Sequence, residues 1–323
     1  MYNEATNSAY NNVNSSEKRK WSVPSDNPTS ERAEGDHGGA RIFGDLTTSL
    51  DFHPRFRVDR SSSIFTIGSC FARNVEEALL QEGFTVLTRS GHFPYAHGYL
   101  NRYNTPTMIQ ELEYAFDVRS FDPASIVAMR SGYSDLTSNG TFSNADEVRR
   151  HRQITTELFK SMAQAGLIII TAGLSEVWFD KKYGTFTNFS PSEAGRQEPD
   201  RFEFRVLDYA TNLKALESLV NLARIVVPGC QIMMTVSPVP LNATFVKRDV
   251  LISNAYSKSC LRAAVEEIYW KYEFVDYFPS FEMVTLSDPA IVWESDRRHV
   301  RPDFVKKIMR EFVRRYINTE SMA

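Results

Sequence analysis

The sequence predicts an α/β fold in which a parallel sheet is covered by helices on both faces. Short apolar runs alternate along the chain with longer stretches whose apolar residues recur every three or four positions. Several of the short runs lack strict polar–apolar alternation, which is typical of parallel strands that are buried on both faces. Strands separated by helices imply right-handed crossovers, and therefore one sheet layered between helices.

The apolar runs predict the strands. They lie at residues 64–67, 85–88, 167–171, 231–236 and 272–277. The stretches with helical periodicity predict helices at residues 73–81, 148–163, 209–225 and 254–271. A last helix is expected to begin at Pro302, because proline suits the first turn of a helix.

Two segments do not follow this alternation of strands and helices. Residues 1–47 are rich in Asn, Ser, Glu, Gly and Arg, and too poor in aliphatic residues to offset the entropy of ordering. We predict a mostly disordered polar tail there, followed by one α/β domain over residues 48–323. Within this domain, residues 101–150 contain a possible helix at 107–116 and a polar loop. They are interpreted as an inserted helical and loop segment.

The net charge, the cysteines and the lengths of the apolar runs disfavour several classes of function. A net charge of −3 at pH 7 gives no basic excess for binding nucleic acid, and the pair Arg297–Arg298 is expected to be a solvated surface patch. Three cysteines with no metal-ligand spacing favour neither a disulfide framework nor a zinc site. No apolar run is long enough to span a bilayer, and no leader segment precedes the polar tail, so a cytoplasmic location is expected.

Ser69 is the first candidate functional residue, because it follows the first predicted strand and opens a helix. Ligands of open parallel sheets gather at the carboxyl ends of the strands, and Gly68 permits a tight turn there. Backbone N–H groups at the helix N-terminus can stabilise an oxyanion beside the hydroxyl. The alternative is that Ser69 only caps the helix. Cys70 is a rival nucleophile, since a helix N-terminus activates thiols, or it is a small buried side chain.

Asp296 and His299 precede the final helix and are three residues apart, so that they share one side of a turn. The carboxylate can orient the imidazole, which suits general-base work at neutral pH. His92 and His97, in the loop after the second predicted strand, are competing candidates for the base. A plain surface pair is the alternative interpretation of Asp296 and His299.

Two loops contain candidate hydrogen-bond donors for an oxyanion. Ser175 and Glu176 follow Gly173 after the strand at 167–171, where Ser175 is a candidate donor and Glu176 a candidate to fix the loop. A helix cap followed by an acidic residue is the alternative. In the loop after the second strand, a backbone N–H near Gly98 or the side chain of Asn104 is a candidate second donor.

The order of these residues along the chain indicates a nucleophilic triad. Ser, Asp and His follow one another in the order found in triad enzymes built on α/β sheets. A Gly-x-Ser-x-Gly elbow is missing, which disfavours the ordinary α/β-hydrolase fold.

The run Ile67-Gly-Ser-Cys-Phe-Ala72 resembles the motif of the GSCFA family, which looks like a branch of the SGNH/GDSL hydrolase superfamily. Further blocks carry the same resemblance: Gly173-Leu-Ser-Glu-Val-Trp178, Thr235-Val-Ser-Pro-Val-Pro240, Tyr256-Ser-Lys-Ser259, Asp276-Tyr-Phe-Pro-Ser280 and Asp296-Arg-Arg-His299. It implies a three-layer α/β/α sandwich with a five-stranded parallel sheet, which is an SGNH or flavodoxin-like arrangement.

The resemblance also implies a reaction. Ser69 matches the nucleophile, His299 the general base and Asp296 its orienting acid, so that an acyl-Ser69 intermediate is expected without a metal or organic cofactor. The expected activity is that of a serine esterase on an O-acylated small molecule or glycan, such as an O-acetylated carbohydrate. The alternatives are an O-acyltransferase of polysaccharide modification and a non-catalytic glycan-binding module.

The sequence departs from the superfamily pattern at the third block. Gly173 matches its glycine, but Ser175 stands where the oxyanion Asn is expected and Glu176 where Asp is expected. Gly98, with Gly91 behind it, is the candidate for the second-block glycine. Loss of one oxyanion donor costs about 100- to 1,000-fold in rate, so the substitution bears on turnover.

Overall fold

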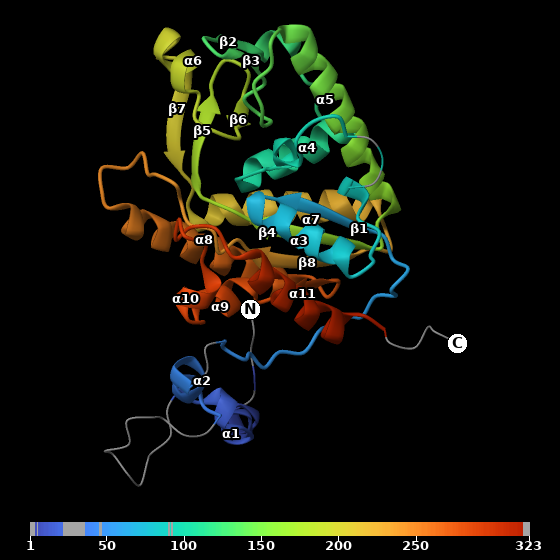
Figure 1. Cartoon of the computed structure of the whole chain (residues 1–323), viewed down its shortest axis with the longest axis vertical. Helices are drawn as coiled ribbons and strands as arrows, with labels where there is room; N and C mark the ends of the chain where they lie inside the picture. Colours follow the sequence, from blue (N-terminus) through green and yellow to red (C-terminus); the bar gives the residue numbers. More distant parts are fainter. Residues whose placement is uncertain are drawn as a thin grey trace.

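The centre of the molecule is a parallel sheet with the strand order β1-β4-β8-β9 (Figure 1). The computed structural model of the chain describes residues 4, 6–21, 36–44, 47–89, 91 and 93–318. The four strands are β1 (Ile64–Gly68), β4 (Leu167–Ala172), β8 (Gln231–Val236) and β9 (Val275–Tyr277). Gly68 lies opposite Thr171 and Thr171 opposite Thr235, so the first three strands end at one edge. The polar residues that follow them therefore meet there.

The sheet of the described residues has four strands, and not the five that the family resemblance implies. The run predicted at residues 85–88 pairs only through a single parallel bridge between Ile64 and Val86. The next residues, Leu87–Arg89, turn into a 3-10 helix, which removes their backbone groups from the ladder. Val86 thus lies at the edge beside β1, where a fifth strand was expected.

Helices cover both faces of the sheet, as the sequence predicts. One face packs in a core with α4 (Thr105–Ala115), α5 (Ala145–Lys160), α7 (Tyr209–Val226) and α8 (Val250–Lys271). The other face packs with α3 (Cys70–Gln81), α9 (Ser280–Thr285), α10 (Pro289–Val292) and α11 (Pro302–Tyr316). Along β1, Phe65 and Ile67 face the first core while Ile64 faces the second, as the two-residue period of a strand requires. The result is three layers.

The structure adds short antiparallel elements that the apolar pattern did not predict. A three-stranded sheet has the order β6-β5-β7, and a hairpin joins β2 to β3. These elements and the helix beside them are β2 (Val127–Met129), β3 (Gly132–Ser134), β5 (Glu176–Asp180), β6 (Thr185–Thr187), α6 (Ser192–Gln197) and β7 (Phe202–Val206). The predicted helix of the inserted segment, α4, packs against α7 within the main core, so it belongs to a helix layer.

The polar N-terminal segment contains two described helices, α1 (Thr6–Asn14) and α2 (Gly38–Gly44). Residues 22–35 lie outside the described residues, and the predicted disorder stays a prediction. The segment joins the domain at Thr48, whose N–H donates to the Ser287 hydroxyl at 3.0 Å. No helix of the described residues combines the length and apolar character that crossing a membrane requires.

A buried ion network holds the chain next to the end of β1. Arg102 is fully buried, and its Nε donates to Glu111 at 2.8 Å. Arg152 donates to the other Glu111 oxygen at 2.6 Å and also pairs with Asp135. Buried charges of this kind are stable only when they are mutually paired. The backbone N–H of Arg102 donates to Gly68 O at 2.8 Å, so the network fixes the loop that flanks Ser69.

Candidate functional site

Ser69 lies at the carboxyl end of β1, at the point where α3 begins. It occupies the N-cap position of α3 with extended backbone angles, and the strand residue before it is Gly68. A Cβ at Gly68 would lie only 2.7 Å from Thr171 Cβ and 2.8 Å from Thr171 O, so only glycine lets β1 and β4 approach this closely. This close approach brings Ser69 to the edge of the neighbouring strand.

The hydroxyl of Ser69 does not cap its helix. No side-chain capping bond is made, although Ser69 stands at the N-cap. Its Oγ instead lies 3.3 Å from the Oγ of Ser237, which directly follows β8. Ser69 is 5% exposed, so the hydroxyl is largely shielded from water. The alternative that Ser69 acts only as a cap is therefore not supported by the hydrogen bonds of the structure.

A small pocket of about 30 Å³ opens over Ser69. Its lining comes from the ends of the strands and from the loop before α11: Ser69, Cys70, Tyr103, Gly173, Leu174, Ser237, Val239, Pro240, Leu241 and Arg298. We call this space the Ser69 pocket. It lies where ligands of parallel sheets gather, at the carboxyl ends of the strands.

Gly173 is one wall of the Ser69 pocket. A Cβ at this position would lie 3.5 Å from Ser69 Cβ and only 2.3 Å from Tyr103 O. Glycine is therefore required for the loop after β4 to lie against both residues. The third-block glycine of the sequence prediction is thus next to the candidate nucleophile.

Cys70 also lines the Ser69 pocket, but its thiol is poorly suited to attack. Burial raises its pKa above the ordinary value, and the Arg298 cation and the Phe71 N–H offset this effect only in part. A raised pKa keeps the thiol protonated at neutral pH, and the thiolate is the nucleophilic form. Ser69 remains the better candidate.

Asp296 and His299 form the pair that their spacing predicts. Nδ1 of His299 lies 2.5 Å from Oδ2 of Asp296, and Oδ1 accepts the backbone N–H groups of Arg298 and His299 at 2.9 Å each. The His299 N–H and the His299 ring hold the pKa of Asp296 well below its usual range. Since Nδ1 faces the carboxylate, it carries the proton and leaves Nε2 as the basic nitrogen.

Arg298 connects this pair to the Ser69 pocket. Its side chain lines the pocket, and its Nη1 lies 3.2 Å from His299 Nε2. The Nε of Arg298 is buried without a hydrogen-bond partner among the described residues. The expectation that Arg297 and Arg298 form a solvated patch is therefore wrong for Arg298, which is half-buried. The bond to Nε2 also means that a guanidinium group occupies the basic nitrogen of the candidate base.

No hydrogen bond among the described residues joins Ser69 to His299 directly. Arg298 lines the same pocket as Ser69 and bonds Nε2 of His299. Bringing the imidazole to the hydroxyl therefore requires the guanidinium of Arg298 to leave Nε2. Catalytic hydrogen bonds are often incomplete in ligand-free structures and tighten in the complex.

Lys258 is a second cation beside the pocket. It is 4% exposed, and its Nζ donates to Gly173 O at 2.6 Å. Burial and the neighbouring Arg298 cation lower the pKa of Lys258 to about 7, while Cys70 acts in the opposite direction. Arg298 and the N-terminus of α3, together with Lys258 when it is protonated, give this end of the sheet a positive potential, which suits an oxyanion.

Ser175 is not brought to Ser69. It is fully buried, its N–H donates to Ser257 Oγ at 2.9 Å, and its Oγ accepts from Asn212 Nδ2 at 3.3 Å. These bonds direct it toward α7 and α8. Glu176 fixes the neighbouring loop, as its sequence position suggests, because it accepts from Thr244 Oγ1 at 2.5 Å and from Phe245 N at 2.9 Å.

Asn104 and Gly98 are likewise engaged elsewhere. Asn104 caps α4 by accepting from Thr107 N at 3.0 Å, and its Nδ2 donates to Thr187 O at 3.0 Å. Gly98 lies in a 3-10 helix and accepts from Asn139 Nδ2 at 2.8 Å. Neither lines the Ser69 pocket. A Cβ added at Gly91 would meet no atom within 4 Å, so this glycine packs against nothing at the site.

His97, one of the two competing histidines, does not line the Ser69 pocket. The ring of His97 stacks on Phe93 with a centroid separation of 6.0 Å, and burial lowers its pKa. His92 lies outside the described residues. No group of three or more His, Cys, Asp or Glu side chains in the described part of the chain is arranged to hold a metal ion.

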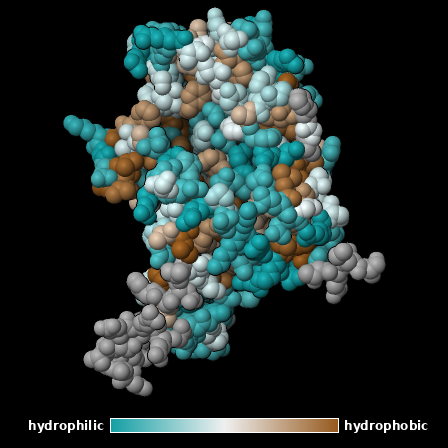
Figure 2. All heavy atoms as spheres, viewed as in Figure 1, coloured by the Kyte–Doolittle hydropathy of each residue, from teal (hydrophilic) through white to brown (hydrophobic). Residues whose placement is uncertain are grey.

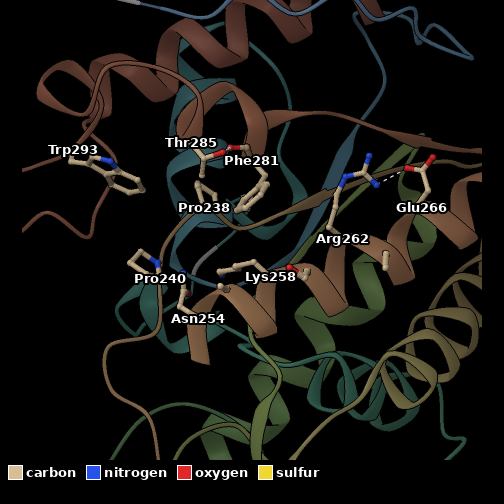
Figure 3. A pocket seen from close by; sticks show the side chains of 12 residues that line it. Pro238, Pro240, Asn254, Lys258, Arg262, Glu266, Phe281, Thr285 and Trp293 are labelled. Atoms are coloured by element: carbon tan, nitrogen blue, oxygen red, sulfur yellow. Dashed lines mark hydrogen bonds and ion pairs between the residues drawn. The ribbon is translucent and has the colours of Figure 1, made fainter. Parts of the chain in front are cut away.

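Two larger clefts flank the Ser69 pocket. One, of about 310 Å³, shares Tyr103, Leu174, Leu241 and Arg298 with it and extends along β5; we call it the polar cleft. The other, of about 770 Å³, shares Pro240 and lies beside α8 (Figure 3); we call it the apolar cleft. A substrate with two large parts joined at the reacting bond fits this arrangement.

Sequence reasoning missed Ser237 and gave no role to Lys258 or Arg298. Ser237 follows a predicted strand, so its place at the carboxyl edge of the sheet was a usable signal. Lys258 lies in the middle of a helix, and nothing in the local pattern shows that its Nζ reaches the loop after β4. Arg298 stands between Asp296 and His299, and only the turn geometry directs it inward.

A comparison with protein-family models matches residues 63–312, most of the chain, to the GSCFA family. The match includes Ser69, Gly173, Lys258 and the segment from Asp296 to His299. No curated protein matches the chain.

Proposed function

The chain belongs to the GSCFA family, and from the geometry around Ser69 we propose that it is a serine esterase-type hydrolase of the SGNH/GDSL superfamily. Ser69 is the nucleophile, His299 the general base and Asp296 the acid that orients it. The substrate is an O-acylated alcohol, and the reaction proceeds through an acyl-Ser69 intermediate without a cofactor.

The observation that carries the proposal is the hydroxyl of Ser69, which bonds Ser237 rather than its own helix and lies in a pocket that Arg298 also lines. A serine at an N-cap normally accepts a backbone N–H of its helix, and this one does not. Arg298 lines the same pocket and bonds the imidazole that Asp296 orients. The side chain of Arg298 thus lies at the pocket of the nucleophile and also bonds the base.

The reaction follows the chemistry of acyl transfer. Ser69 Oγ attacks the carbonyl carbon of the ester, and its proton passes to His299 Nε2 once Arg298 has left that nitrogen. The carbonyl oxygen becomes an oxyanion, to which the guanidinium can then turn. When the intermediate collapses, the alcohol leaves with the proton from Nε2. A water molecule then attacks the acyl-enzyme and gives a proton to Nε2; when this second intermediate collapses, Nε2 returns the proton to Ser69 Oγ and the carboxylic acid is released.

Arg298 and Lys258 also supply the oxyanion stabilisation that the Asn expected in the third block would have provided. Ser175 and Asn104 have their hydrogen bonds elsewhere, so the oxyanion cannot rely on them. Two cations and the backbone N–H groups at the start of α3 take over this role. Electrostatic stabilisation by fixed donors is usually the largest contribution to this kind of catalysis.

The polar cleft supports a hydroxylated alcohol such as a carbohydrate. Trp178 and Phe245 line it together with Asn188, Asn242 and Ser190. The Nε1–H of Trp178 is buried and has no hydrogen-bond partner among the described residues. A buried donor without a partner is uncommon, and a ligand hydroxyl would satisfy it once the indole turned toward the cleft.

Two further activities use the same site. An O-acyltransferase would pass the acyl group to a sugar hydroxyl, and a second cleft beside Ser69 offers room for such an acceptor. A non-catalytic glycan-binding module is favoured by the bond between Arg298 and His299 Nε2, which blocks the base in this conformation.

Labelling with a fluorophosphonate that reacts with activated serines tests the proposal. We expect the wild type to be labelled on Ser69, the Cys70→Ala variant to be labelled equally, and the Ser69→Ala variant not at all. An unlabelled wild type supports the binding module, and a folded but unlabelled Cys70→Ala variant would move the nucleophile to the thiol. Faster consumption of an acyl donor on adding saccharides identifies a transferase.

A further inference from the structure

The apolar cleft lies between α8 and the segment formed by α9 and Trp293 (Figure 3). Its volume of about 770 Å³ is within the range of small-molecule sites. The lining residues come from three places, the loop after β8, one face of α8, and the segment from Phe281 to Trp293. In Figure 3 the rings of Phe281 and Trp293 and the two prolines surround the open space.

Most polar side chains of this cleft already have protein partners. Arg262 pairs with Glu266 at 2.5 Å and with Glu282 at 2.9 Å. Asn254 Oδ1 accepts from Leu241 N at 3.1 Å, and Thr285 Oγ1 donates to Phe281 O. A sugar would need unengaged donors and acceptors to replace its water, and these groups offer few.

Apart from Lys258 and Ser259, the remaining lining is apolar. Its members are Pro238, Pro240, Ala255, Ala263, Phe281 and Trp293. Surfaces of this kind gain free energy by removing hydrocarbon from water and give no orientation to hydroxyl groups. The cleft therefore offers a mainly apolar surface to a bound chain.

The cleft reaches the reacting centre. Pro240 lines both the apolar cleft and the Ser69 pocket. The stem of Lys258 lines the cleft while its Nζ bonds Gly173 O, and Gly173 lies against Ser69. A chain seated in the cleft can thus end at the Ser69 hydroxyl.

The apolar character continues outside the cleft along α8. Leu251 is 75% exposed and Ile252 58% exposed, and Ala255 of the next turn lines the cleft itself. Figure 2 shows hydrophobic surface over the first turns of α8, on the side where Figure 1 places that helix. An apolar surface that leads into an apolar cleft suits a long hydrocarbon chain better than a short acetyl group.

We propose that the apolar cleft binds the hydrocarbon chain of a medium- or long-chain fatty acyl ester, with the alcohol in the polar cleft on the other side of Ser69. The part of this proposal that concerns the ester rests on the proposed function. The binding of the chain does not, because it depends only on the cleft.

Binding is tested without catalysis. Decanoate is titrated by calorimetry into Ser69→Ala, and into Ser69→Ala that also carries Ser259→Trp or Ala263→Trp, two exposed cleft positions where an indole fills the space. The control carries Ile225→Trp, at an exposed residue of α7 that does not line the cleft. We expect saturable binding that both cleft variants weaken at least tenfold and the control leaves unchanged.

Reactivity is tested with ethyl and decyl fluorophosphonates, which share one reactive group. Each fully buried methylene is worth roughly a fourfold gain, so even partial burial predicts inactivation at least about tenfold faster for the decyl probe. Ser259→Trp should remove this advantage, and the Ile225→Trp control should retain it.

The outcomes separate the two proposals. Labelling by both probes at equal rates, or decanoate binding that neither cleft variant weakens, overturns the acyl-chain assignment and leaves the esterase proposal standing. Absence of saturable decanoate binding overturns it as well. Saturable binding that the cleft variants abolish, in a protein whose Ser69 is not labelled, retains the cleft assignment and rejects the esterase.

Discussion

The guanidinium of Arg298 lies 3.2 Å from Nε2 of His299, on a ring whose other nitrogen bonds Asp296. This contact places a cation on the one nitrogen that a general base needs. The same cation lines the pocket over Ser69. In the mechanism that we propose, one movement of the guanidinium both releases Nε2 and brings the cation to the oxyanion, so the two events are coupled.

Replacing His299 by alanine removes the base. We expect ester hydrolysis to fall about 100- to 10,000-fold, the usual contribution of general-base catalysis. His97→Ala should retain most activity, because that ring packs on Phe93 and does not line the Ser69 pocket. The loss of rate in each folded variant is measured by steady-state hydrolysis of a p-nitrophenyl ester. Equal losses would move the base to the second loop.

Arg298→Ala should lower kcat about tenfold to a hundredfold and change KM little, because the guanidinium acts on the oxyanion rather than on the bound ester. Arg298→Lys should recover part of the loss, since it restores the charge without the planar group. The two constants are measured separately with the same ester. An unchanged kcat would show that the guanidinium does not act on the oxyanion, and a raised kcat would show that Arg298 only blocks the base.

Lys258 should make stability depend on pH. Burial lowers its pKa to about 7 from an ordinary value of 10.5, so between these values the unfolded chain binds more protons than the folded one. Stability therefore rises as the pH increases from about 7 to about 10.5, by up to roughly 1.4 kcal/mol per pH unit.

Urea unfolding of Lys258→Met from pH 7 to pH 10 tests this effect. The variant lacks the titrating group, so its advantage over the wild type should be greatest near pH 7 and shrink as the pH rises. Lys214→Met, at an exposed position of α7, is the control and should follow the wild type. A constant difference between Lys258→Met and the wild type across this range contradicts the buried ammonium.

Gly173→Ala should disturb the site through the backbone. The added Cβ would meet Tyr103 O at 2.3 Å, so the loop after β4 has to move away from Ser69. We expect a loss of about 2 kcal/mol or more in the free energy of unfolding, together with slower phosphonate labelling. Gly229→Ala meets no atom within 4 Å and should change stability by less than about 0.5 kcal/mol. Equal losses of unfolding free energy in the two variants would mean that the loop after β4 moves away at little energetic cost.

The layered architecture could be predicted because each strand and helix is determined by a short pattern of neighbouring residues. The runs that became β1, β4 and β8 are continuous and apolar, and the helices between them have clear periodicity. The run around Val86 misled because its composition is strand-like, whereas the turn at Leu87–Arg89 ends the pairing. The sheet of β5, β6 and β7 was missed because its strands are short and half-buried, so their alternation is weak.

The site was predictable only where it depends on position along the chain. The edge occupied by Ser69 and the pairing of Asp296 with His299 follow from strand order and spacing. Ser175 is a polar residue after a strand, as an oxyanion donor would be, yet Ser257 and Asn212 engage it from helices distant in sequence. The inward direction of Arg298 and the reach of Lys258 also depend on tertiary packing, which no local pattern encodes.

A crystal structure of the protein inactivated by a fluorophosphonate tests the central claim most directly. The account predicts phosphorus bonded to Ser69 Oγ, His299 Nε2 within hydrogen-bond distance of that oxygen, and the guanidinium of Arg298 turned toward the phosphonyl oxygen. An adduct on Cys70, or an adduct on Ser69 with Nε2 still bonded to Arg298 and remote from the phosphonate, would contradict it.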